Sequence, residues 1–347
     1  MKRTYYELRR LFIALCAILF SPLIYLLIWR KPCASFENSR ILVIPHLTRI
    51  GDLMCATPVF RAIKEKYPNA YLAVMVSGRL KGLLKNNQHV DEVITYKHRF
   101  LFQTINIIRS KKFDWGFSLS GTSTSSLISF LGVIPNRAKI TRRPRPLSEL
   151  MTDWLTDHQI LYKHHTYLPR RYLDLLELIE IKNPPEIKEV GFSAGGDEKA
   201  KEFDSFVGIS ITAGNKIKEW GDEKFKELAI KIRDKYGAKI VFIGSKNDEK
   251  RIRKILFPGA ASATIFSLEE LPSLLNRLKL LIAVDTGPIY IAHALKVPLI
   301  DIIGPVDPNE QPPHDAISLQ VLPPSNIMPS SFVMKKPGRY EEHKKAT

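Results

Sequence analysis

Residues 280–294 read LLIAVDTGPIYIAHA: an apolar run, a sharp turn and a second apolar segment. The first five residues predict a buried strand, and Pro288 fits the first turn of a helix, where no N–H is needed. The turn between them, Asp285-Thr286-Gly287, would present free backbone N–H groups and the positive end of a helix dipole. A phosphate is the natural occupant of such a turn, and the glycine lets the backbone approach it closely.

Strand and helix patterns alternate along most of the chain on both sides of this turn. Such alternation is typical of doubly wound parallel sheets, and a Pro-Pro linker at 182–186 divides it into two halves. We therefore expect a first domain over 40–185 and a second over 186–322, facing each other across a cleft. Expected strands are 40–45, 71–76, 90–95 and 115–120, then 206–211, 239–243, 264–266, 280–284 and 298–303; expected helices are 57–67, 102–110, 122–131, 168–181, 222–236, 248–256, 268–278 and a last one from Pro288, with a loop at 132–146.

The chain is strongly basic. Its 347 residues carry a formal net charge of +17, and residues 1–39 contain only six of the basic and two of the acidic side chains. The charge is therefore spread through the folded part, which indicates an anionic partner such as nucleic acid, a phospholipid surface or a phosphorylated substrate; a solubilising surface accounts for part of it equally well. No nucleic-acid recognition motif accompanies the charge, so we expect no nucleic-acid partner. Cys16, Cys33 and Cys55 make no disulfide framework or metal cluster.

An uncharged segment of 19 residues, 11–29, lies between Arg9-Arg10 and Arg30-Lys31. Its length can cross a hydrocarbon core of about 30 Å, which predicts that residues 1–39 form a membrane anchor. Ser21-Pro22 lies in the middle of the segment, where proline can break a helix. A hairpin that enters only one leaflet is therefore an open alternative to a span.

An acidic residue follows the first expected strand, where residues 50–53 read Ile-Gly-Asp-Leu. Gly51 allows a tight turn and places Asp52 at the mouth of the expected cleft. A carboxylate there can act as a general base. The alternative is that Asp52 caps the helix expected from Thr57.

Two loops of the second half carry charged residues beyond strand ends. Lys216 and Lys218, in the loop that begins at Thr212, could meet a diphosphate, or they belong to a solvated charged loop. Asp248, after the next strand, could bind ribose hydroxyls or cap the following helix.

Several short motifs follow one another along the chain in a characteristic order. They are Ile50-Gly51-Asp52-Leu53 with Thr57-Pro58, Phe60 to Lys64, Tyr67 to Ala70, Val90 to Ile94, Phe113-Asp114-Trp115, His165 to Leu176, Lys218-x-Trp220, Gly244-Ser245, Asp285-Thr286-Gly287 and Gly304-Pro305. From about Arg40 to Pro313 this order resembles the ADP-heptose:lipopolysaccharide heptosyltransferases, the inverting glycosyltransferases of family 9. Two positions depart from that family: Tyr290 stands where it has His, and Gly221 stands where it has Pro.

The resemblance implies a GT-B fold, in which two Rossmann-like domains face a cleft, with the acceptor on the first and a nucleotide-sugar donor on the second. By similarity, Asp52 would deprotonate an acceptor hydroxyl that attacks the anomeric carbon with inversion. Lys218 would stabilise the leaving diphosphate together with the backbone at the Asp-Thr-Gly turn, without a metal ion or other cofactor. ADP-heptose is one candidate donor. The remaining donor-binding residues would be Thr212, Lys216, Asp248, Asp285, Thr286 and Gly287.

A membrane anchor suggests an acceptor that lies at the membrane, such as a lipid-linked saccharide of the lipopolysaccharide core. Basic residues that could contact its phosphates, or else belong to a solvated loop, are Lys139, Arg142, Arg143 and Arg145. We expect the protein at the inner membrane with its catalytic domains in the cytoplasm, and a basic, flexible tail over 323–347. The alternative function is a catalytically inactive homologue that binds nucleotide sugars or scaffolds a membrane complex, which the two departures keep open.

Overall fold

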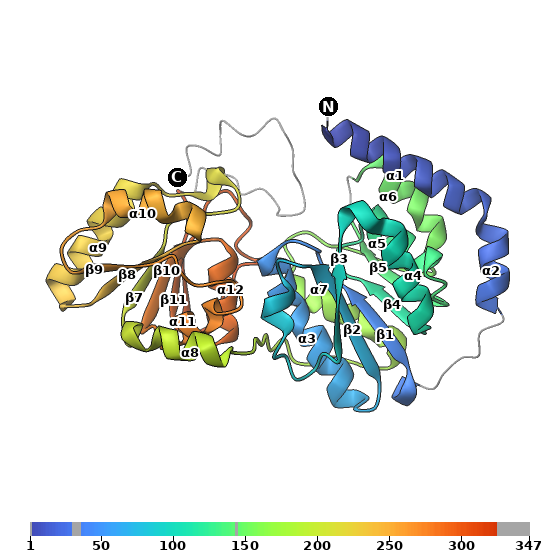
Figure 1. The fold of residues 1–347 in the computed structure, drawn as a ribbon, viewed down its shortest axis with the longest axis horizontal. Helices are drawn as coiled ribbons and strands as arrows, with labels where there is room; N and C mark the ends of the chain where they lie inside the picture. The colour runs from blue at the N-terminus through green and yellow to red at the C-terminus, as the bar shows by residue number, and fades with distance from the viewer. Residues whose placement is uncertain (1, 30–35, 143–144, 325–347) are drawn as a thin grey trace.

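The computed structural model describes residues 2–29, 36–142 and 145–324. It shows two lobes side by side, each built around a six-stranded parallel sheet with helices on its faces (Figure 1). The strand orders are β3-β2-β1-β4-β5-β6 in the first lobe and β12-β11-β10-β7-β8-β9 in the second. Counted along the chain, both sheets follow the order 3-2-1-4-5-6, which is the doubly wound arrangement. The α/β class with two parallel sheets is therefore confirmed.

The first lobe contains two strands in stretches that the sequence pattern did not assign to strands. Its elements are β1 (Arg40–Ile44), α3 (Ile50–Lys66), β2 (Tyr71–Ser77), β3 (Glu92–Tyr96), α4 (Leu101–Lys111), β4 (Trp115–Ser118), α5 (Ser123–Leu131), β5 (Asn136–Thr141), α6 (Leu147–Met151), β6 (His158–Leu161) and α7 (Leu168–Asp174). The expected loop at 132–146 was wrong, because it contains β5. The expected helix at 168–181 is α7 followed by a 3-10 helix, η5 (Leu175–Ile179).

Strand β5 escaped recognition because it carries charged residues at buried positions. Arg137 is 2% exposed and pairs with Asp157 at 2.7 Å; Lys139 is fully buried and pairs with Asp153 at 2.8 Å. Buried charges persist only with such partners, and these partners follow the strand in the sequence. A basic, proline-rich stretch read without them resembles a loop.

The second lobe follows the expected alternation with shifts at its ends. Its elements are α8 (Ala194–Ala200), β7 (Val207–Ser210), η7 (Lys216–Lys218), α9 (Asp222–Tyr236), β8 (Ile240–Ile243), η8 (Lys246–Asp248), α10 (Glu249–Ile255), β9 (Ala260–Ala263), α11 (Leu271–Arg277), β10 (Leu280–Val284), α12 (Gly287–Ala294), β11 (Leu299–Ile302) and β12 (Ser318–Val321). The strand expected at 264–266 lies instead at β9, and β12 continues the sheet beyond the last expected strand. Most of the expected tail, from 325 onward, lies outside the described residues.

One apolar core runs through both lobes and fixes how they meet. Buried side chains of α3 and α7 in the first lobe form a single cluster with those of α11 and α12 in the second. Figure 1 shows α3 and α12 facing each other at the centre of the molecule. The packing of α3 against α12 therefore helps to set the mutual position of the lobes.

The amino-terminal segment is a bent pair of helices, α1 (Lys2–Leu19) and α2 (Ser21–Trp29). Taken singly, none of the helices that the structure describes is both long and apolar enough to cross a membrane. The stretches Glu7–Leu19 and Ser21–Ile28 reach that length and composition only together, and the angle between them is 62°. The break comes directly before Ser21-Pro22, where the sequence predicted that the helix could be interrupted. The expected single membrane helix is thus not confirmed.

Candidate active site

Both lobes place charged side chains at the point where the order of the strands in the sheet reverses. In a doubly wound sheet, the loops after the first and fourth strands diverge there and leave a crevice for ligands. In the first lobe, the loop after β1 leads to Asp52 at the start of α3. In the second lobe, the loop after β7 carries Lys218 and the turn after β10 carries Asp285. The predicted residues therefore lie where the topology creates a crevice.

The two reversal points contact each other. A Cβ atom at Gly51 would lie 2.9 Å from Cε2 of Tyr290, and a Cβ atom at Gly287 would lie 2.8 Å from Cδ1 of Ile50. Interiors are close-packed and do not admit such overlaps, so glycine at both positions lets the lobes approach this closely. The structure thus brings the Ile-Gly-Asp and Asp-Thr-Gly motifs, which are far apart in the sequence, into one site.

Asp52 is a buried carboxylate in the first turn of α3, with 4% of its surface exposed. The helix begins at Ile50, seven residues before the expected start, and its N-cap residue is Arg49, so Asp52 does not cap a helix from Thr57. An anion in the first turn is stabilised by the helix dipole. No hydrogen bond or ion pair of this carboxylate is found within the described ranges, so it is not committed to another side chain.

Two ionisable neighbours of Asp52, Cys55 and Tyr172, stay neutral near pH 7. Burial raises the pKa of the Cys55 thiol to about 12, and the charge of Asp52 adds to this effect. Burial, with a smaller contribution from Asp52, also raises the pKa of Tyr172 well above its usual value. A carboxylate with no side-chain partner can accept a proton from a bound hydroxyl.

Asp285 is held from two sides in the second lobe. Its side chain is 3% exposed; the Lys218 ammonium forms an ion pair with Oδ2, and the Tyr290 hydroxyl donates a hydrogen bond to Oδ1. Burial, followed by the charge of Asp285, raises the pKa of Tyr290 well above its usual value, so this hydroxyl remains a donor. The residue that departs from the family pattern therefore orients the aspartate of the Asp-Thr-Gly turn.

A second carboxyl, Asp301 on β11, lies behind this group. It is fully buried, and neither of its oxygens has a hydrogen-bond partner in the part of the chain that the structure describes. Burial and then the charge of Asp285 raise its pKa well above the usual value, while Lys218 opposes them. Sequence reasoning missed Asp301; the available signal was a single acid inside the apolar run of a strand.

The loop from Thr212 to Lys218 is anchored at its far end. The Glu219 carboxylate accepts a hydrogen bond from the backbone N–H of Ala213 at 3.2 Å and pairs with Arg251 at 2.9 Å. Thr212 is half-buried and Lys216 is exposed. Of the lysines expected at the diphosphate, the structure therefore brings Lys218 to the Asp-Thr-Gly turn and leaves Lys216 at the surface.

Asp248 forms a capping box at the start of η8. The backbone N–H and the hydroxyl of Ser245 both donate to its Oδ2, at 2.9 and 2.6 Å. Asp248 is thus the first-turn acid of η8, whereas at the N-cap position of the following helix, α10, its side chain makes no capping hydrogen bond. Asp248 follows β8, one strand further from the reversal point than the loop with Lys218.

The predicted acceptor-binding arginines lie beside α6 and already have acidic partners. Arg142 pairs with Glu149 at 3.4 Å, and Arg145 pairs with Asp153. Arg143 lies outside the described residues. Lys139 is buried in β5, so it does not extend into a solvated loop. Among the described residues, no hydrogen bond or ion pair joins Lys139, Arg142 or Arg145 to Asp52.

Sequence reasoning also missed a loop of the second lobe that enters the first. Glu310, which is fully buried, accepts hydrogen bonds from the backbone N–H of Leu168 at 2.6 Å through its carbonyl and from that of His165 at 3.1 Å through its carboxylate. Next to it, the Gln311 Nε2 atom is buried near Gly51 without a partner among the described residues. The only sequence signal was the Gly304-Pro305 motif before this proline-rich stretch.

Lys218 and the N-terminus of α12 both contribute positive charge at the site. Thr286 is the N-cap of this helix, and its side chain makes no capping hydrogen bond. Across the ranges given above, no three His, Cys, Asp or Glu side chains gather closely enough to hold a metal ion.

Comparison with known proteins identifies the family. The model of glycosyltransferase family 9 (heptosyltransferase) matches residues 101–335. Lipopolysaccharide heptosyltransferase 2 of Escherichia coli (strain K12) is 24% identical over 322 residues, which cover 82% of this chain and 88% of that protein.

Two solved structures share the fold. The family 9 glycosyl transferase of Veillonella parvula superposes with a TM-score of 0.73 at 20% identity, covering 83% of this chain and 87% of that one. The ADP-heptose lps heptosyltransferase II of E. coli gives 0.71 at 21% identity, covering 88% and 97%. Together with the family match, these likenesses show that the chain is a glycosyltransferase of family 9, the heptosyltransferase family.

Proposed function

We propose that this glycosyltransferase moves a sugar, heptose or a related one, from a nucleotide-diphosphate donor to a lipid-linked saccharide such as the lipopolysaccharide core. The observation that carries the proposal is the contact between the two reversal points, with Asp52 on one side and Lys218 and Asp285 on the other. The names of the curated relatives, lipopolysaccharide heptosyltransferases, support this class of donor and acceptor.

In the proposed reaction, Asp52 takes the proton of an acceptor hydroxyl. The oxygen forms a bond to the anomeric carbon while the bond from that carbon to the diphosphate oxygen breaks, and the electron pair leaves with the diphosphate. Attack opposite to the leaving group inverts the anomeric carbon. The Lys218 ammonium and the start of α12 supply the positive charge that the departing diphosphate needs, so we propose that transfer requires no metal ion.

The ion pair between Lys218 and Asp285 suggests how the donor is received. A diphosphate carries more negative charge than one carboxylate and competes for the same ammonium. Once Lys218 turns to the diphosphate, Oδ2 of Asp285 is free to accept a hydrogen bond from a sugar or ribose hydroxyl, while Tyr290 still holds Oδ1. Thr212, Lys216 and Asp248 stay in the proposed donor site, on the condition that Lys216 turns inward from the surface and Asp248 releases Ser245.

We further propose that the chain works at the cytoplasmic face of the inner membrane. The acceptor is lipid-linked in this proposal, and α1 and α2, which form the apolar bent pair, belong to the lobe that would receive it. Arg142, Arg143 and Arg145 remain candidates for acceptor phosphates, on the condition that Arg142 and Arg145 exchange their present acidic partners.

The test combines donor binding with turnover. The full chain is screened by thermal shift against ADP-, GDP- and UDP-linked sugars, because a ligand that binds only the folded state raises the melting temperature. The donor that binds is then offered with a lipid-linked core saccharide, and the anomeric configuration of the product is determined. We expect transfer with inversion from the stabilising donor. Binding without transfer to any core acceptor would favour the inactive homologue, and no binding would refute the proposal.

A further inference from the structure

We propose that α1, α2, α6 and the 3-10 helix η4 (Thr152–Leu155) form one surface that lies flat in the interface of an anionic lipid bilayer. This inference deepens the membrane location proposed above. It rests on the outer face of these helices and not on the transferase site, so the two can fail separately. We call this surface the lipid-facing surface.

The helices α1 and α2 expose apolar residues where a surface helix of a water-soluble protein exposes polar ones. Their small residues face the lobe: Ala14 and Ala17 are 0% and 4% exposed. Most of their large apolar residues face outward instead, which leaves an apolar face that no other part of the described chain covers. These outward residues are Leu8, Phe12, Leu15, Leu19, Phe20, Leu23, Leu26 and Leu27, and Phe12 and Leu19 are more than 60% exposed.

The inner face of the pair is fixed to the first lobe. Ala14, Ala17 and Ile24 pack against α5 and η4. The Tyr25 hydroxyl donates to the Trp154 carbonyl at 3.1 Å. The N-terminus of α6 is also tied to α1, because the backbone N–H of Ser148 donates to Glu7 at 3.3 Å. A straight transmembrane helix would lose these contacts, so the structure favours a pair that lies along the membrane.

The helix α6 lies beside α1 (Figure 1), and both α6 and η4 contact α1 and carry exposed apolar side chains. Leu147 and Leu150 are 59% and 45% exposed, and Trp154 is 81% exposed. Tryptophan is enriched at membrane–water interfaces, where one part of the ring is apolar and the other can bond to water.

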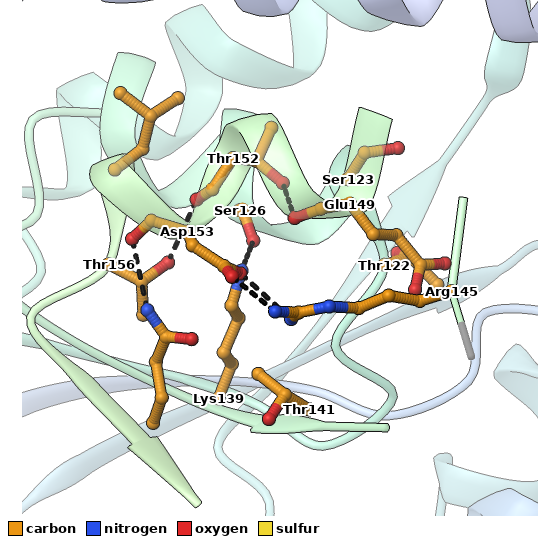
Figure 2. A network of polar contacts seen from close by, with 12 residues as sticks. Thr122, Ser123, Ser126, Lys139, Thr141, Arg145, Glu149, Thr152, Asp153 and Thr156 are labelled. Atoms are coloured by element: carbon orange, nitrogen blue, oxygen red, sulfur yellow. Dashed lines mark hydrogen bonds and ion pairs between the residues drawn. The ribbon is translucent and has the colours of Figure 1, made fainter. Parts of the chain in front are cut away.

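These exposed side chains stand on a rigid base. Asp153 precedes Trp154 in η4. Figure 2 shows that its carboxylate forms ion pairs with both Lys139 and Arg145 on the inner side of this helix. The Thr152 hydroxyl closes the helix by donating to the Ser148 carbonyl at 3.1 Å. The network fixes α6 and η4 against the sheet, so Trp154 is presented outward by the fold and not by a loose loop.

The positive charge beside the lipid-facing surface favours lipid over a second copy of the chain as its partner. Arg9 and Arg10 flank the apolar face of α1, and both lower the pKa of His98 in addition to the effect of burial, which places their charge at this edge of the lobe. A second copy would bring the same positive charge to the contact. Anionic headgroups neutralise it. An anionic bilayer therefore satisfies both the apolar face and its basic edge.

The experiment uses the full chain and vesicles of phosphatidylcholine with or without phosphatidylglycerol. Flotation is compared for the wild type, for Leu150→Ser with Trp154→Ser, and for Tyr236→Ser, which removes an aromatic side chain of similar exposure from the second lobe. We expect the double variant to lose about tenfold or more in partitioning, from the apolar area no longer buried in lipid. We expect the control to bind like the wild type, and all proteins to bind better with phosphatidylglycerol.

A second measurement keeps the result independent of folding. Lipids brominated near the headgroup end of their chains should quench fluorescence of the wild type more than that of Trp154→Phe, which keeps the surface apolar. Equal flotation of all three proteins, or no quenching assigned to Trp154, would overturn the proposal. So would self-association without vesicle binding. A wild-type protein that binds the vesicles but transfers no sugar would refute the proposed transfer reaction and leave the membrane-surface proposal standing.

Discussion

The contact between the lobes predicts that Gly51→Ala impairs transfer without removing donor binding. The new Cβ atom would lie 2.9 and 3.0 Å from two ring atoms of Tyr290 and 3.1 Å from Nε2 of Gln311. The ring cannot move aside freely, because its hydroxyl is bound to Asp285. Overpacking of this kind costs about 1–3 kcal/mol, so we expect the melting temperature to fall by a few degrees.

The effect on rate should exceed the effect on stability. Relieving the overlap displaces the start of α3, and a displacement of about 1 Å at a catalytic group can cost about 10²-fold in rate. We expect kcat to fall by about that factor, while the donor dissociation constant changes little because the second lobe is intact. Gly195→Ala is the matched control, since a Cβ atom there meets nothing within 4 Å.

Adding Tyr290→Ala to Gly51→Ala supplies a double-mutant cycle. Removing the ring makes room for the new methyl group, so the combined loss of stability should be smaller than the sum of the single losses. Gly51→Ala with the melting temperature and turnover of Gly195→Ala would refute the reasoning, because it would show that the two motifs do not meet at this distance.

Two further outcomes follow from the charges of the second lobe. Burial and the charge of Asp285, opposed by Lys218, keep a proton on Asp301 in the folded chain, whereas the unfolded chain loses this proton above about pH 4, so the stability contributed by Asp301 falls as pH rises. Calorimetry should show that Asp301→Leu flattens this decline and stabilises the protein at pH 8 by about 1–3 kcal/mol. An unchanged slope of stability against pH would contradict the assigned proton. Lys218→Met should lower the rate of transfer by about 10²-fold or more, as expected for loss of charge at the leaving group. The control is Lys231→Met, since Lys231 is exposed and pairs with Glu227, and Lys218→Met should melt at a lower temperature than this control. Equal turnover of the two variants would remove Lys218 from the reaction.

Elements with a clear local pattern were predictable from the sequence. The strand at 280–284 and the helix at 222–236 agree with β10 and α9 because their hydrophobic spacing and end residues are local. The strand β5 was not predictable, since its buried Lys139 depends on Asp153, whose approach is set by the fold. The start of α3 was placed too late, because the glycine and aspartate of its first turn are typical of a loop as well.

The places of the candidate residues in the fold were predictable from the sequence, but their contacts were not. Asp52, Lys218 and Asp285 were expected at the ends of strands, and the topology places them there. Two features depend on strand register and on the packing of the lobes: the bond from Tyr290 to Asp285 and the unpaired carboxyl of Asp301. No sequence pattern reports on either, since the partners come from different elements.

The most direct test of the proposed chemistry is transfer by Asp52→Asn, which keeps the shape of the side chain and removes the base. With donor and lipid-linked acceptor at saturating concentration, the rate of transfer is measured beside the thermal shift caused by the donor alone. We expect the wild-type thermal shift and a rate lower by about 10²–10⁴-fold. A rate equal to that of the wild type would contradict it, because the acceptor hydroxyl would then lose its proton to another group.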